Sequence, residues 1–166
     1  MIKQFLRWAG LVILMYILQT TIVPVISICG IKPDLLMLVL FYCAFRTDVI
    51  PAVFAGFFIG LSQDFYSPVI LGQNAFAKTI AGFFAGMFNE KVMRIDPLFQ
   101  MLLILLMFFI HDTVLFAVQV AKSGSSPESA ALQLVTFTLP RAIYSLFFAL
   151  IPAFREYLFP SGIKRL

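Results

Sequence analysis

The chain has 166 residues, of which 61% are hydrophobic and only 12% charged, and its formal net charge is +4. Soluble domains carry about 25% charged residues, and a soluble protein this apolar would expose large hydrophobic patches. The basic residues fall singly or in pairs between apolar runs, which excludes a nucleic-acid surface. We therefore expect an all-α polytopic membrane protein surrounded by lipid, with residues 1–166 forming a single transmembrane domain.

Six apolar segments are candidates for membrane spans, each of which takes about 20 residues. Their runs are continuous rather than alternating, which favours helices, because an isolated strand leaves its backbone groups without partners in lipid. The breaks between them contain charge, Gly or Pro, as turns do. In chain order the predicted spans are Phe5 to Cys29, Pro33 to Phe45, Val49 to Gln63, Leu71 to Phe88, Pro97 to Ala121, and Ala131 to Tyr157.

The first three spans allow alternative interpretations. The first could be a signal peptide, but its apolar run is long and further spans follow at once, so we interpret it as an uncleaved helix that contains Pro24. The second and third could form one helix from Asp34 to Leu61. That helix would place Arg46 and Asp48 in mid-membrane at about 3 kcal/mol each, so two short helices are expected.

The distribution of basic residues predicts the orientation. With the N-terminus inside, eight of the twelve basic residues lie on the inner side, two lie outside, and Lys78 and Arg141 fall within spans. Such a bias predicts cytoplasmic N- and C-termini and an even number of spans. The inner residues are Lys3, Arg7, Arg46, Lys91, Arg94, Arg155, Lys164 and Arg165, and the outer ones are Lys32 and Lys122.

Small residues recur at a spacing of four in two spans. Such rows let helix backbones approach closely in lipid. They predict either packing within this chain or a docking face for another membrane protein. The residues are Ala52, Gly56 and Gly60 in the third span, and Ala77, Ala81 and Ala85 with the adjacent Gly82 and Gly86 in the fourth.

Ionisable residues in or beside the spans form a second pattern. At about 1.5 Å of rise per residue, five of them fall in the outer half of the membrane, namely Asp34, Asp64, Lys78, Asp112 and Arg141. Charges there pair with each other or line a cavity, so the pattern predicts a clamp between helices, a ligand or lipid-headgroup site, or a proton path. We expect Arg141 to bond Asp112, with Asp64 or His111 completing the network. The full set is Asp34, Asp64, Lys78, His111, Asp112 and Arg141.

The sequence predicts no catalytic, cofactor or metal site. His111 is the single histidine, and Cys29 and Cys43 are expected at opposite membrane faces, so neither a metal cluster nor a disulfide is predicted. The sequence also shows no nucleophile paired with a base, no phosphate-binding loop, and no soluble region that could hold such groups.

One group of short motifs resembles a known family. It comprises Leu18-Gln19, Pro33-Asp34, Gly56, Gly60-Leu61 with Asp64, Leu71-Gly72 with Asn74 and Ala75, and then Gly82 and Gly86. In this order the motifs resemble the MreD family of bacterial rod-shape proteins. The resemblance extends from about Leu18 to Phe88, and beyond it rests on length and hydropathy.

The resemblance implies a six-helix protein of the bacterial inner membrane with no enzymatic activity and no cofactor. It implies a partner, MreC, with one span and a periplasmic coiled coil, and indirect association with the RodA glycosyltransferase, a penicillin-binding transpeptidase and the MreB filament. It also implies a fold similar to the substrate-binding subunits of energy-coupling-factor vitamin transporters, which is the alternative function. Those subunits often have a small-xxx-small pair in the first span, whereas here Ala9 and Gly10 form no such pair.

Overall fold

A computed structural model describes residues 2–28, 30–66, 71–88, 97–123, 132 and 134–158. The described part is helical, and its only β-type pairing is an isolated bridge between Ile28 and Ile31. The prediction of an all-α protein is therefore confirmed. The helices are α1 (Ile2–Thr21), α2 (Leu35–Arg46), α3 (Val49–Tyr66), α4 (Gln73–Met87), α6 (Pro97–Ser123) and α8 (Leu139–Leu158), with a π-helical turn, η1 (Leu134–Thr138), directly before α8.

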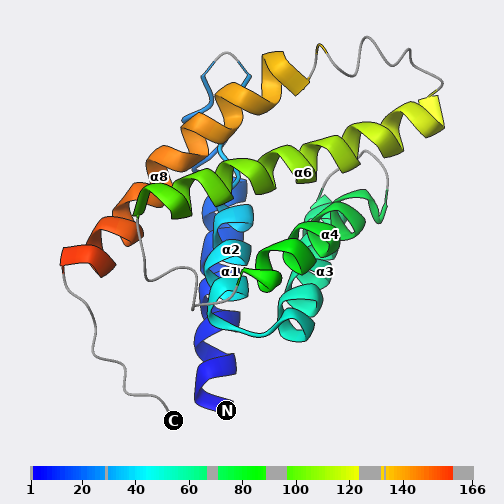
Figure 1. The fold of residues 1–166 in the computed structure, drawn as a ribbon. Helices are drawn as coiled ribbons and strands as arrows, with labels where there is room; N and C mark the ends of the chain where they lie inside the picture. The colour runs from blue at the N-terminus through cyan, green and yellow to red at the C-terminus, as the bar shows by residue number, and fades with distance from the viewer. Residues whose placement is uncertain are drawn as a thin grey trace.

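Helix α2 lies at the centre of the bundle. It packs against α1, α3, α4, α6 and α8, and α3 and α4 form a closely packed hairpin beside it. Figure 1 shows α6 and α8 crossing the upper part of the bundle at a steep angle to α1 and α2. Nearly every side chain of α2 is apolar, and most of them are buried against the surrounding helices.

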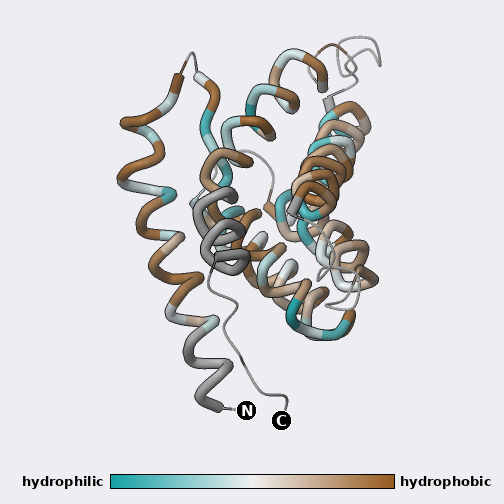
Figure 2. Tube along the Cα trace, turned by 60° about the vertical axis from the view of Figure 1, so that its left-hand side comes forward, coloured by the Kyte–Doolittle hydropathy of each residue, from teal (hydrophilic) through white to brown (hydrophobic). Residues whose placement is uncertain are grey.

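The outer surface of the bundle is also apolar. Large hydrophobic side chains on α1, α3, α4, α6 and α8 are exposed, and Figure 2 shows hydrophobic residues along α1 at the edge of the bundle. Within the described residues, Val49–Tyr66 and Leu98–Lys122 are helical segments long and apolar enough to cross a membrane. The apolar segments of α1, α2 and η1–α8 are shorter than the length expected of a membrane-crossing helix.

The first predicted span ends earlier than expected. Helix α1 stops at Thr21, and residues 22–26 form turns, so the predicted helix to Cys29 is wrong. Pro24 has no N–H and disfavours the helical conformation in the residue before it, so the chain turns here. Cys29 itself lies outside the described residues, whereas Cys43 is buried and free.

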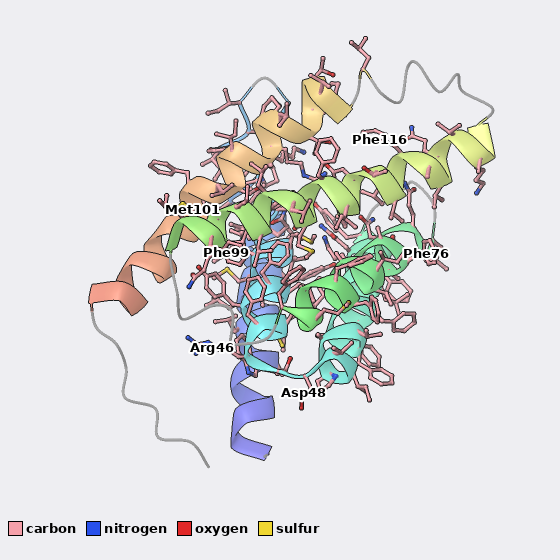
Figure 3. The ribbon with its side chains drawn as sticks, viewed as in Figure 1. Arg46, Asp48, Phe76, Phe99, Met101 and Phe116 are labelled. Carbon is pink, nitrogen blue, oxygen red and sulfur yellow. The ribbon has the colours of Figure 1, made fainter. Side chains whose placement is uncertain are left out.

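The predicted break between the second and third spans is confirmed. Helix α2 ends at Arg46, α3 begins at Val49, and the backbone N–H of Thr47 closes α2 by donating to the carbonyl of Ala44. Figure 3 places Arg46 and Asp48 at this turn, and both are exposed. The alternative of one long helix is therefore wrong.

The sixth predicted span is not one regular helix. It begins with the wider turn η1, and Pro140 is the second residue of α8. Because proline has no N–H to donate to the turn before it, a wider backbone turn at this point is reasonable. Residues 89–96, which include Lys91 and Arg94, and residues 124–131 lie outside the described part of the chain, as do Lys164 and Arg165.

Glycines bring the backbones of α3 and α4 into contact. A Cβ atom added to Gly56 would meet the carbonyl of Lys78, and one added to Gly60 would meet the carbonyl of Asn74. On α4, a Cβ on Gly82 would lie 2.6 Å from the carbonyl oxygen of Ala52. These approaches fix α4 against α3 and so place Lys78 toward the interior. The rest of the two rows, Ala52, Ala77, Ala81, Ala85 and Gly86, is also buried.

Candidate functional site: a closed ring of charged side chains

Asp34 joins the start of α2 to two other helices. It is the N-cap of α2, and its Oδ1 accepts a hydrogen bond from the backbone N–H of Met37 at 2.9 Å. Its Oδ2 accepts from Lys78 Nζ on α4 at 2.9 Å and from Arg141 Nη2 on α8 at 3.1 Å. Its own backbone N–H donates to Ser145 Oγ on α8 at 3.0 Å. Both oxygens of this carboxylate are therefore used.

Asp112, on α6, closes the network from the other side. Arg141 Nη1 donates to Asp112 Oδ1 at 3.3 Å, and His111 Nδ1 lies 2.8 Å from the same oxygen. The second nitrogen of His111, Nε2, is 3.4 Å from Lys78 Nζ. Since Lys78 also bonds Asp34, the contacts form a closed circuit. We call these five residues, Asp34, Lys78, His111, Asp112 and Arg141, the charge ring.

The ring determines the tautomer of His111. An ammonium group only donates hydrogen bonds, so Nε2 must accept from Lys78, and the proton of the neutral imidazole then lies on Nδ1 and is donated to Asp112. With a neutral histidine, two carboxylates face two cations. The ring is therefore electrically balanced.

Four of the five side chains are removed from solvent. The exposed fraction is 0% for Lys78 and His111, 1% for Asp34 and 4% for Asp112, against 27% for Arg141. A buried charge without a partner costs several kcal/mol, and close opposite charges with good hydrogen bonds offset this cost. Removing one charged member alone therefore upsets the charge balance inside the bundle.

Asp64 does not belong to the ring. The expected network in which Asp64 joins Arg141 and Asp112 is therefore not formed. The Asp64 carboxylate lies at the end of α3 and accepts hydrogen bonds at 2.9 Å from the backbone N–H groups of Asn74 and Ala75, and from the side-chain amide of Asn74. The N-cap of α4 is Gly72, which has a φ of +92° and no side chain with which to cap its own helix. Asp64 therefore supplies the missing cap from the neighbouring helix.

Several of the motif residues lie at helix ends. Gln19 near the end of α1 donates through Nε2 to the carbonyl of Pro33 at 3.1 Å, and its Oε1 accepts from the backbone N–H of Leu35 at 2.9 Å. Pro33 is buried beside Asp34, whereas Leu71 is exposed. Gln19 thus holds the residue pair that flanks Asp34.

Three contacts of this region were not predicted from the sequence. They are the ion pair between Lys78 and Asp34, the bond from Asp34 to Ser145, and the clamp made by Gln19. The first had a usable signal, because Asp34 and Lys78 were both placed in the outer half of the membrane. Ser145 and Gln19 are uncharged, so the pattern of ionisable residues did not include them.

The ring joins the N-terminus of α2 to α4, α6 and α8. Its members bond mainly to one another, and the described residues include no group of three or more His, Cys, Asp or Glu that could hold a metal ion. The geometry is that of a cross-link between helices inside an apolar bundle.

Fold and ring together define a helical bundle with an apolar exterior and a charge-balanced polar cross-link in its interior. A family model described as rod shape-determining protein MreD matches residues 1–159, so the chain belongs to the MreD family. It is accordingly a membrane protein that determines cell shape, in a family not known for enzymes. The chain matches no curated protein and no solved structure.

Proposed function

We propose that this chain is a non-enzymatic, multi-pass subunit of the rod-shape complex in the bacterial inner membrane. In this role it docks a single-span partner similar to MreC and thereby supports peptidoglycan synthesis. The observation that carries the proposal is the family match over residues 1–159. Association with RodA, a penicillin-binding transpeptidase and MreB would be indirect, through that partner.

A rigid scaffold fits the interior of the bundle. The charge ring cross-links four helices, and the glycine contacts bring α3 and α4 together at backbone distance. We assign a structural role to the ring and to the small-residue rows within a single transmembrane domain. The exposed apolar side chains would then contact lipid or the partner helix. Nothing in the comparisons favours the alternative of a vitamin-transporter subunit.

Docking can be tested in a rod-shaped bacterium that produces this protein. Depleting the chain should turn rods into spheres, and a tagged copy should restore rods and co-purify with the single-span partner. A copy with Lys32 replaced by methionine, an exposed position outside the ring, serves as the matched control and should behave as the unaltered chain. Persistent rods after depletion would contradict the proposal.

We propose a topology of six spans with both termini in the cytoplasm, because this orientation would put eight of the twelve basic residues on the inner side and two on the outer side. Helices α2 and α4 are short for a span and would cross the membrane with the help of neighbouring helices. An alkaline phosphatase fusion after Asp48 should be inactive, and one after residue 126 should be active. An active fusion after Asp48 would exclude this topology.

A further inference from the structure

Arg141 and His111 share one acceptor atom. Both donate to Asp112 Oδ1, Arg141 from 3.3 Å and His111 from 2.8 Å. The oxygen therefore receives the guanidinium of α8 and the imidazole of α6 at the same time. A change in the charge of either group alters how strongly the carboxylate holds the other.

The charge balance of the ring connects these two groups. With Arg141 in place and His111 neutral, two cations face two carboxylates. If Arg141 leaves, Lys78 alone faces both carboxylates, and one proton on His111 restores the balance. If His111 takes up a proton while Arg141 stays, three cations face two anions. Buried sites strongly resist such an imbalance.

The groups that face His111 come from every element packed against α6. These elements are α2, α4, α8 and η1. Asp34 at the start of α2, Lys78 of α4 and Arg141 of α8 bring charges, Asp112 is on α6 itself, and η1 brings the uncharged Thr138. The count of two carboxylates and two permanent cations therefore includes every described charged group of the ring.

Arg141 is the least enclosed member of the ring. Its side chain is 27% exposed, whereas the other four are almost fully enclosed. The π-helical turn η1 and Pro140 precede it, and both interrupt regular helical hydrogen bonding. After its departure Asp34 still has Lys78, and Asp112 still has His111.

We propose that Arg141 is a latch between α8 and the rest of the bundle, and that release of this latch is coupled to uptake of one proton by His111. At neutral and higher pH His111 is uncharged and Arg141 holds α8 in place. At lower pH the imidazolium takes over the charge that Arg141 supplied, and α8 moves away from α6. This device goes beyond the proposed docking function and does not depend on it.

Distances between two spin labels can follow the release of the latch. One label replaces Phe147 on α8 and the other Phe58 on α3, which are 68% and 63% exposed. The full chain, with Cys29→Ser and Cys43→Ala to remove other thiols, is reconstituted in lipid nanodiscs and frozen between pH 8 and pH 5. We expect one narrow distance at high pH and a second distance at low pH. The ratio of the two populations should change by about tenfold per pH unit at most, the limit for one proton.

Three comparisons make the result decisive. His111→Gln, which carries no titrating proton, should keep the narrow distance at every pH, and Arg141→Met should give the second distance at every pH. Labels at Phe58 and Phe76, on the α3–α4 hairpin, should show no dependence on pH, which separates the latch from unfolding. If the distance in the labelled parent does not change with pH, the proposal is overturned, whatever the ring variants show. A pH response that persists in His111→Gln also overturns it.

Discussion

Replacing Lys78 by methionine is expected to lower the free energy of unfolding by about 3–5 kcal/mol, the usual loss when one partner of a buried ion pair is removed. The side chain is fully buried, and without it Asp34 and Asp112 share Arg141 alone. Methionine fills a similar volume, so the loss measures charge rather than a cavity. Reversible denaturation of the purified chain in detergent gives the value.

The matched experiment removes one anion as well. Asp34→Asn in the Lys78→Met background leaves Arg141 and Asp112 as a balanced pair, and the asparagine oxygen still accepts from the backbone N–H of Met37. The double variant should therefore be more stable than Lys78→Met alone. Lys32→Met, at an exposed position, should stay within about 0.5 kcal/mol of the unaltered chain. A Lys78→Met protein of unaltered stability would show that the ring contributes nothing to the fold.

Gly60→Ala should destabilise the α3–α4 hairpin by about 3 kcal/mol or more, at the upper end of overpacking effects. The added Cβ would meet the carbonyl oxygen of Asn74 and lie 2.5 Å from the Cα of Ala75. These are backbone atoms, so no side chain can rotate to make room and the helices must separate. Separation would also withdraw Asp64 from the start of α4.

Gly10→Ala is the control for this prediction. A Cβ at Gly10 would meet nothing within 4 Å, and the residue lies inside α1. Alanine favours helix over glycine by about 1 kcal/mol, so this change should be neutral or stabilising. Thermal denaturation in detergent and the yield of folded protein measure both variants. Equal melting temperatures for Gly60→Ala and Gly10→Ala would contradict the close contact at Gly60.

The first span is predicted too long, because the sequence does not show what holds the chain after Thr21. The apolar run predicts a span that contains Pro24 and reaches Cys29, yet α1 ends at Thr21. In lipid a proline can be accommodated where neighbouring groups satisfy the freed carbonyls. Here the chain turns instead, and Gln19 and Tyr144 bond the backbone of the connection at Pro33, Leu35 and Ile26. Those partners are distant in sequence, so the pattern around Pro24 could not reveal them.

The sequence by itself determined the helical class and the break between α2 and α3, and it predicted a common depth for the charged residues. Each depends on local chemistry: continuous apolar runs, the cost of Arg46 and Asp48 in lipid, and a rise of about 1.5 Å per residue along a helix. Only the tertiary structure decided which charges meet. Depth does not specify how a helix is rotated or which helix lies beside it, so Asp34 and Asp64 looked equivalent although one joins the charge ring and the other caps α4.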